Sequence, residues 1–325
     1  MHFVPKLMSV NKDKHEPKER RLIKVRAKRS INHLSYSSAS GYAECGERWR
    51  LSRVYGLDKS TWWVTIMGTA VHAVTEALDL ADVDALPDNL APLIEPEGFL
   101  RAFEKAKQDA ARRGGEIRAS GRTLKKGIGK GGGPNKKDEE WCIHWGPQIV
   151  NSWVEWREKM GLEVALFPTR DGEWLPGVEL EVRKPIGGYP YVGYIDRVFE
   201  DANGEYVVVD LKTGNPPQSS TQLKAYAAQL RAAGVPVARA AYWMGMDGDV
   251  LEWVPTPPEG DEFVAAWLSN VGRGLEAGVF TASPSSFCSA CPVREYCRAV
   301  GGVRAGEVPA VERPIKINNK EGNMV

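Results

Sequence analysis

Residues 193–214 read GYIDRVFEDANGEYVVVDLKTG, which predicts two strands joined by a turn. Two runs rich in β-branched and aromatic residues flank a turn that contains Asn203 and Gly204, which is a strong hairpin signal. We predict a three-residue loop, Ala202 to Gly204, in which Gly204 takes the left-handed conformation of a type I turn followed by a bulge. The length of this loop matters because side chains alternate between the two faces of a strand.

The predicted loop determines which side chains meet beyond the hairpin. A three-residue loop places Asp196 directly opposite Asp210, whereas a loop of two or four residues would send Asp196 to the other face. Asp210 and Lys212 are two positions apart in the sequence, so they share a face of their strand. Two carboxylates suit Mg²⁺ or Mn²⁺, and a neighbouring lysine can stabilise charge that develops on a phosphate. The competing interpretation is an ordinary solvent-exposed hairpin.

Helical and strand patterns alternate along the rest of the chain, which predicts an α/β fold. Expected helices cover residues 38–55, 68–80, 98–112, 138–160, 219–233 and 259–277, and expected strands cover 162–167, 177–184, 190–199, 205–212, 238–246 and 249–254. The strand before the hairpin contains VELEV, which places Glu179 and Glu181 on one face and Val178, Leu180 and Val182 on the other.

Three further polar residues stand on predicted helices. His72 ends the segment GTAVH on the helix that begins near residue 68, where a neutral imidazole would serve as a metal ligand. A single helical histidine is more often a surface or hydrogen-bonded residue. Gln222 and Tyr226 are four positions apart, so they share a face of the helix that follows the strand of Asp210.

Four of the five cysteines form a pattern. Cys45 stands alone, and Cys288, Cys291 and Cys297 come together in CSACPVREYC. One distant and three clustered cysteines indicate a metal site rather than a disulfide framework, and both zinc and a 4Fe–4S cluster accept four thiolates. Cys142 has no neighbouring cysteine and is expected to be a small buried apolar residue.

The segments GTAVH, GYID, VVDLKTG and QLKAY, taken in order, resemble the motifs of the RecB-like branch of the PD-(D/E)XK nucleases. The resemblance implies a restriction-endonuclease-like mixed central sheet flanked by helices. It also implies a divalent-metal site formed by His72, Asp196, Asp210 and the carbonyl of Leu211. The resemblance makes Lys212 the catalytic lysine, and Gln222 and Tyr226 the helical motif beside it. Ile195 stands where the motif has proline, a departure common in the superfamily. Members often add an acid from the preceding strand, which here is Glu179 or Glu181.

The cysteine pattern around this core is similar to that of the iron–sulfur exonucleases of the same branch, such as the CRISPR-associated RecB-like exonucleases and the AddB nuclease domain. The resemblance implies a structural 4Fe–4S cluster on Cys45, Cys288, Cys291 and Cys297 that joins the N- and C-terminal segments. The segment YAECGERW around Cys45 resembles the pattern Y-x-x-C-P-x-R-W, with Gly46 in place of the proline.

Charge is distributed unevenly although the net charge is only +1. Residues 1–30 hold ten Lys or Arg against three acids, and residues 112–137 are again basic and rich in glycine. We predict a flexible basic arm over 1–30, one nuclease domain over 31–300 that contains the basic loop 112–137, and a polar tail over 301–325. The basic segments suit a nucleic-acid partner or are simply solvated, and Trp62, Trp63 and Trp141 are candidates to line a channel for DNA.

These features and the resemblance predict a metal-dependent DNA exonuclease that acts on single-stranded DNA or DNA ends in recombination, replication or CRISPR-type processing. The alternatives are a structure-specific endonuclease, a non-catalytic DNA-binding adaptor and a zinc-ribbon-like interaction protein. The sequence contains no helicase P-loop, so any helicase or recombination partner would be a separate protein. No apolar run approaches the ~18 residues of a membrane span, and the absence of a secretory signal together with an odd cysteine count predicts a cytoplasmic protein.

Overall fold

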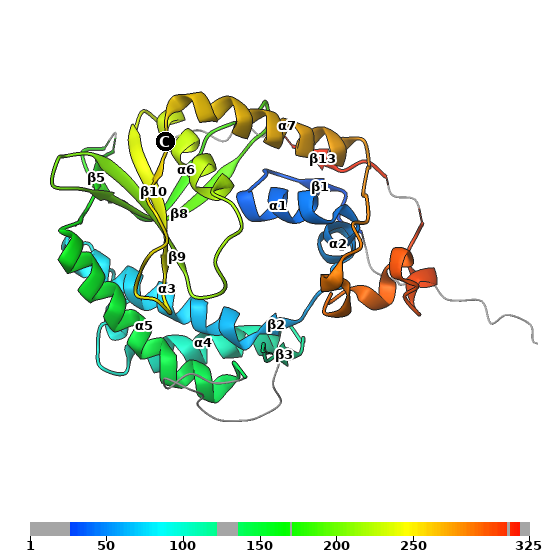
Figure 1. The fold of residues 1–325 in the computed structure, drawn as a ribbon, viewed down its shortest axis with the longest axis horizontal. Coiled ribbons are helices and arrows are strands. Elements are labelled where there is room, and N and C mark those ends of the chain that lie inside the picture. Colours follow the sequence, from blue (N-terminus) through cyan, green and yellow to red (C-terminus); the bar gives the residue numbers. More distant parts are fainter. Residues whose placement is uncertain (1–26, 122–135, 170, 311–312, 319–325) are drawn as a thin grey trace, which may run out of the picture.

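The structure is a computed structural model that describes residues 27–121, 136–169, 171–310 and 313–318. At the centre of this part of the chain lies a seven-stranded mixed sheet (Figure 1). Its strand order is β11–β10–β9–β8–β4, with β7 also paired to β8 and β12 to β10. The strands are β4 (Glu163–Val164), β7 (Val178–Arg183), β8 (Val192–Glu200), β9 (Tyr206–Lys212), β10 (Val237–Met244), β11 (Asp249–Val250) and β12 (Val254–Pro255).

β7, β8 and β9 form an antiparallel meander, and helix α6 (Thr221–Ala232) then leads to β10, which runs parallel to β9. The turn between β8 and β9 has the predicted geometry. The N–H of Gly204, whose φ is +75°, donates to the carbonyl of Asp201 at 2.8 Å. The register of this hairpin, continued by one position past its last pair, sets Asp196 opposite Asp210.

Helices cover both faces of the sheet (Figure 1). One face is covered by α3 (Trp63–Ala81) and α5 (Glu139–Met160), against which α4 (Gly98–Arg112) packs, and the other face packs against α6. Cys142 is fully buried in the first of these cores, as predicted, and burial raises the pKa of its thiol to about 12. Trp141 is only 2% exposed and belongs to the same core, so the prediction that it lines a channel for DNA was wrong. Its position on the inner face of an amphipathic helix explains this.

The N-terminal segment departs from the continuous helix expected over residues 38–55. It consists of α1 (Tyr36–Glu44), α2 (Gly46–Trp49) and a π-helical turn (Arg50–Val54), with a break at Cys45. Cys45 is extended, with φ −160° and ψ 99°, and its sulfur accepts the N–H of Arg48 at 3.4 Å. A Cβ on Gly46 would lie 2.9 Å from the backbone nitrogen of Thr281, so glycine lets the C-terminal segment approach the break.

The C-terminal segment packs against the N-terminal one. After α7 (Asp261–Glu276), β13 (Lys316–Ile317) pairs in parallel with β1 (Ser30–Ile31). The structure differs here from the expected polar tail, because Val308, Ile315 and Ile317 are buried in a third core with α1 and α7. Ile315 and Ile317 are two positions apart, so both present apolar side chains to one side.

Two small sheets complete the described chain: β2 (Thr61–Trp62) with β3 (Ile117–Arg118), and β5 (Leu166–Pro168) with β6 (Trp174–Pro176). The expected strand 162–167 is thus divided between β4 and β5. Most of the predicted arm and residues 122–135 of the predicted basic loop lie outside the described residues. Within those residues, no helix has the length and apolar character that crossing a membrane requires.

Candidate metal centre

The candidate site lies where β8 and β9 separate. Backbone pairing between the two strands ends one position before Asp196 and Asp210. Beyond that point the carboxylate of Asp196 takes the place of a backbone acceptor, because its Oδ2 receives the N–H of Leu211 at 2.8 Å. The separation opens the sheet, and side chains from α3 and α6 approach it from opposite faces.

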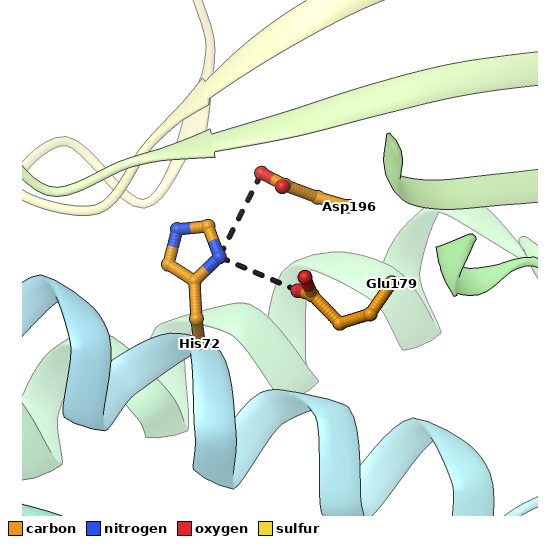
Figure 2. Close-up of side chains that lie close together, drawn as sticks. All are labelled: His72, Glu179 and Asp196. Atoms are coloured by element: carbon orange, nitrogen blue, oxygen red, sulfur yellow. Dashed lines mark ion pairs between the residues drawn. The ribbon is translucent and has the colours of Figure 1, made fainter. Parts of the chain in front are cut away.

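Three side chains converge on the α3 side of this opening. His72 Nδ1 lies 3.5 Å from Glu179 Oε1 and 3.8 Å from Asp196 Oδ2, and one ligand atom from each residue lies within 4.8 Å of the others (Figure 2). Two oxygen or nitrogen ligands of a Mg²⁺ ion are about 3 Å apart at a right angle and about 4 Å apart when opposed. The spacing and the donor set therefore fit a divalent cation.

Glu179, rather than Glu181, is the glutamate in this group. Its φ is +45°, a left-handed value that is rare for a residue with a side chain. The expected alternation along β7 fails at this point, because Val178 packs on the α3 side of the sheet and Leu180 on the α6 side. Glu179 consequently points to His72, whereas Glu181 is exposed and paired with Arg183.

The electrostatics of His72 reflect its two neighbouring carboxylates. Burial alone would lower the pKa of His72, but Asp196 and Glu179 outweigh it and raise the pKa to about 9. On the other edge of the ring, Nε2 lies 3.2 Å from the carbonyl oxygen of Leu211. With its N–H at Nε2 donating to that carbonyl, the neutral ring offers the Nδ1 lone pair to a cation. The resemblance implied the Leu211 carbonyl as a ligand, and here it contacts the ring of His72.

Asp210 and Lys212 lie on the α6 side of the opening and form an ion pair. The side-chain amide of Gln222 donates to Asp210 Oδ1 at 2.9 Å, and its nitrogen lies 2.8 Å from the hydroxyl of Tyr226. Burial and the charge of Asp196 raise the pKa of Asp210 to about 7. Burial would lower the pKa of Lys212, but Asp210 and Asp196 reverse the effect and raise it. The sequence therefore correctly predicted that Asp210, Lys212, Gln222 and Tyr226 lie together, and they lie at the same opening as Asp196.

Gly68 brings α3 against the end of β9. A Cβ added to this residue would lie 2.7 Å from Thr213 Oγ1, so only glycine allows the present approach. His72 stands one helical turn beyond Gly68, on the same side of α3. The spacing of glycine and histidine in GTAVH thus places the imidazole at the separated strands.

Comparison with known proteins identifies the superfamily of this chain. The PD-(D/E)XK nuclease superfamily matches residues 33–298. The chain belongs to this superfamily. It is similar to the Gene 69 protein of Mycobacterium phage D29, with 26% identity over 273 residues that cover 81% of this chain and 95% of the relative. The Gene 69 protein of Mycobacterium phage L5 is 25% identical over 292 residues, with the same shares of both chains.

One solved structure, the crystal structure of SSO0001, can be aligned with this chain, and the alignment covers 74% of this chain and 86% of the SSO0001 chain. The identity is 11% and the TM-score is 0.30, which is too low to bear on the fold. Superfamily membership makes nuclease activity with a divalent metal the expected chemistry, and the group of His72, Glu179 and Asp196 has the donors that such an ion needs.

The four cysteines predicted as a cluster line a single pocket, which Cys45 reaches from the α1–α2 break and Cys288, Cys291 and Cys297 from turns that follow α7. The N–H of Ser285 donates to Cys288 Sγ at 3.3 Å, and Arg48 and Arg294 also line the pocket. All of these cysteines are free of disulfides. No three of the sulfur atoms in the described chain lie within 4.8 Å of one another.

Sequence reasoning missed one element of the site. Arg197 follows Asp196 directly and is fully buried behind it, beside Asp79 of α3. The available signal was a pair of charged residues, Asp196 and Arg197, inside the otherwise apolar strand segment YIDRVF. Because charged residues are almost never fully buried without a partner, a buried strand that carries both signs indicates an internal ion-pair network.

Proposed function

We propose that this nuclease-superfamily protein is a divalent-metal-dependent deoxyribonuclease of the RecB-like branch that degrades single-stranded DNA or DNA ends. The observation that carries the proposal is the convergence of His72, Glu179 and Asp196 beside the Asp210–Lys212 pair. Hydrolysis would add water to the scissile phosphorus and break the P–O bond to the leaving nucleotide. A bound Mg²⁺ or Mn²⁺ would polarise that phosphate and lower the pKa of the attacking water.

In this proposal His72, Glu179 and Asp196 hold the cation. The resemblance implies Asp210 and the carbonyl of Leu211 as further ligands. That carbonyl lies beside Nε2 of His72, on the edge of the ring opposite Nδ1, so it joins the same cation only after the imidazole has turned. Gln222 fixes the orientation of the Asp210 carboxylate through its amide. Tyr226 holds Gln222 in turn, since its hydroxyl contacts only the Gln222 amide among the hydrogen bonds of the described chain.

Lys212 is the residue that we assign to charge stabilisation. The raised pKa keeps its ammonium group protonated at neutral pH, which makes it a poor general base. Its Nζ also lies 5.7 Å from the ring centroid of Tyr242, which limits where the side chain can move. The ammonium group of Lys212, held beside the scissile phosphate, would stabilise the negative charge that develops in the transition state and would orient the attacking water.

We further propose that Cys45, Cys288, Cys291 and Cys297 hold a structural 4Fe–4S cluster. Four thiolates around one zinc ion at about 2.3 Å would all be about 3.8 Å apart, whereas no three of these sulfurs lie within 4.8 Å of one another. The shared pocket, the N–H donors to Cys45 and Cys288 and the nearby guanidinium of Arg48 favour a larger anionic group. Such a cluster would join the break after α1 to the turns after α7.

Exonuclease activity can be separated from the alternatives with two substrates. End-labelled linear single-stranded DNA and circular single-stranded DNA are incubated with Mn²⁺ or Mg²⁺, with Lys212→Ala as the control. Loss of the linear strand alone, absent in the variant, supports an exonuclease at this site. Cutting of the circle supports an endonuclease instead. Binding of both substrates by metal-loaded protein that cuts neither supports a DNA-binding adaptor.

A further inference from the structure

Arg197 occupies the centre of a buried polar network behind the metal site. The side chain is fully buried and its guanidinium lies 5.7 Å from the ring centroid of Trp153. Its Nε donates to Asp79, which is 1% exposed, and this pair neutralises both charges. Because a buried guanidinium is costly unless each of its donors is satisfied, the directions of its remaining N–H groups are informative.

Those remaining donors are directed at the metal site. Nη1 donates to Glu179 Oε1 at 3.2 Å and to the backbone carbonyl of Asp196 at 2.6 Å. Nη2 donates to the hydroxyl of Thr75 at 3.0 Å. The single proton of that hydroxyl is shared between the backbone carbonyls of Val71, at 3.0 Å, and His72, at 3.1 Å. One guanidinium therefore contacts the carboxylate of Glu179 and the backbone of Asp196 directly, and it reaches the backbone of His72 through Thr75.

We infer that Arg197 is a positioning residue that sets the affinity of this site for its divalent cation, an inference that rests on the proposed function. Glu179 has a left-handed backbone, a strained conformation that persists only where surrounding contacts hold it. The ion pair with Arg197 supplies such a contact and aims Oε1 at His72. The planar fork of arginine satisfies Asp79, Glu179 and Thr75 together, which the single ammonium of lysine does not.

The chain offers a matched control in Arg157. This residue pairs with the same Asp79 from α5 and also with Asp82, and neither of these two partners is a candidate metal ligand. Both arginines stabilise the buried carboxylate of Asp79. A purely structural role predicts similar consequences for the loss of either one, whereas a positioning role predicts an effect on the cation for Arg197 alone.

The test measures Mn²⁺ binding to the full chain by isothermal titration calorimetry, with folding checked by circular dichroism. We expect Arg197→Met and Arg197→Lys to bind Mn²⁺ about 10–100-fold more weakly than wild type. In other metalloproteins, the loss of a hydrogen-bond partner of a metal ligand weakens metal binding by a similar factor. Arg157→Met should bind like wild type. Equal affinities for wild type and a folded Arg197 variant would overturn the inference.

A second pair of variants covers the case in which Arg197 variants do not fold. Thr75→Val removes the hydroxyl that links Arg197 to His72, and Thr75→Ser restores it. We expect weaker Mn²⁺ binding for the valine variant and recovery for the serine variant; equal binding by both would contradict the inference. Failure of wild type itself to bind Mn²⁺ would overturn the proposed function, and the inference with it.

Discussion

The carboxylate of Asp196 accepts the backbone N–H of Leu211 at 2.8 Å, across the point where β8 and β9 separate. This bond connects the two halves of the site. On one side Asp196 belongs to the group with His72 and Glu179, and on the other Leu211 stands between Asp210 and Lys212. A displacement of either strand therefore moves the candidate metal ligands and Lys212 together.

Gly68→Ala tests the approach of α3 to this strand end. Alanine is favoured over glycine inside a helix by about 1 kcal/mol, but its Cβ would lie 2.7 Å from Thr213 Oγ1. We expect the substitution to destabilise the protein by ~1–2 kcal/mol in the wild-type background. In a Thr213→Ala background the same change should be stabilising, because the conflicting oxygen is gone. Urea unfolding of the four proteins measures the cycle, and a stabilising effect in both backgrounds would contradict the geometry.

Cation binding should depend on pH. The pKa of Asp210 is raised to about 7 and that of His72 to about 9, and each group must release its proton to bind a metal. The affinity for Mn²⁺ should therefore increase as the pH rises from about 6 to about 9. Asp210→Asn should remove the part of this increase that is centred near pH 7. Calorimetric titrations across the range measure it, and an affinity independent of pH would refute the prediction.

Gln222 and Tyr226 should differ in importance. Gln222→Ala leaves Asp210 Oδ1 without its amide donor, and loss of a hydrogen bond to a charged group costs about 1.5–3 kcal/mol. A decrease in kcat of about 10–100-fold is expected. Tyr226→Phe should have a smaller effect because its hydroxyl reaches Asp210 only through Gln222. Steady-state kinetics that rank the two variants in the opposite order would contradict the assigned roles.

Cys291→Ala should remove the proposed cluster. Loss of one ligand should abolish the visible absorbance and the bound iron and sulfide, and lower the Tm, because the cluster joins the two ends of the chain. Cys142→Ala is the control, since Cys142 is buried in a different core and does not line the pocket. Colourless wild-type protein that contains zinc would instead favour a zinc site.

The sequence predicted the hairpin and its register because Asn203 and Gly204 specify a turn by local backbone chemistry alone. The i, i+4 spacing similarly predicted that Gln222 and Tyr226 lie together. The choice of Glu179 could not be predicted, because regular alternation treats it like Glu181 and only tertiary contacts impose its left-handed backbone. The burial of Val308 and the C-terminal strand pair depend on contacts with the distant N-terminus, to which local patterns are insensitive.

The break at Cys45 illustrates the same limit. Residues 38–55 have a helical pattern, and Gly41 and Gly46 alone are too weak a signal to locate an interruption. The interruption turns Cys45 toward the pocket that it shares with Cys288 and its neighbours, and Gly46 allows Thr281 to approach. Both requirements come from a segment more than two hundred residues away.

We propose that His72, Glu179, Asp196 and Lys212 form a metal-dependent nuclease site. Single-turnover cleavage of linear single-stranded DNA by wild type, Lys212→Ala and Glu179→Gln, each titrated with Mn²⁺, tests it most directly. We expect wild type to cleave only when Mn²⁺ is present, and we expect the cleavage rate of Lys212→Ala at saturating metal to be lower by about 10²–10³-fold or more. Glu179→Gln should require more Mn²⁺ for its residual activity. Cleavage by Lys212→Ala at the wild-type rate, or by wild type without a divalent metal, would contradict the claim.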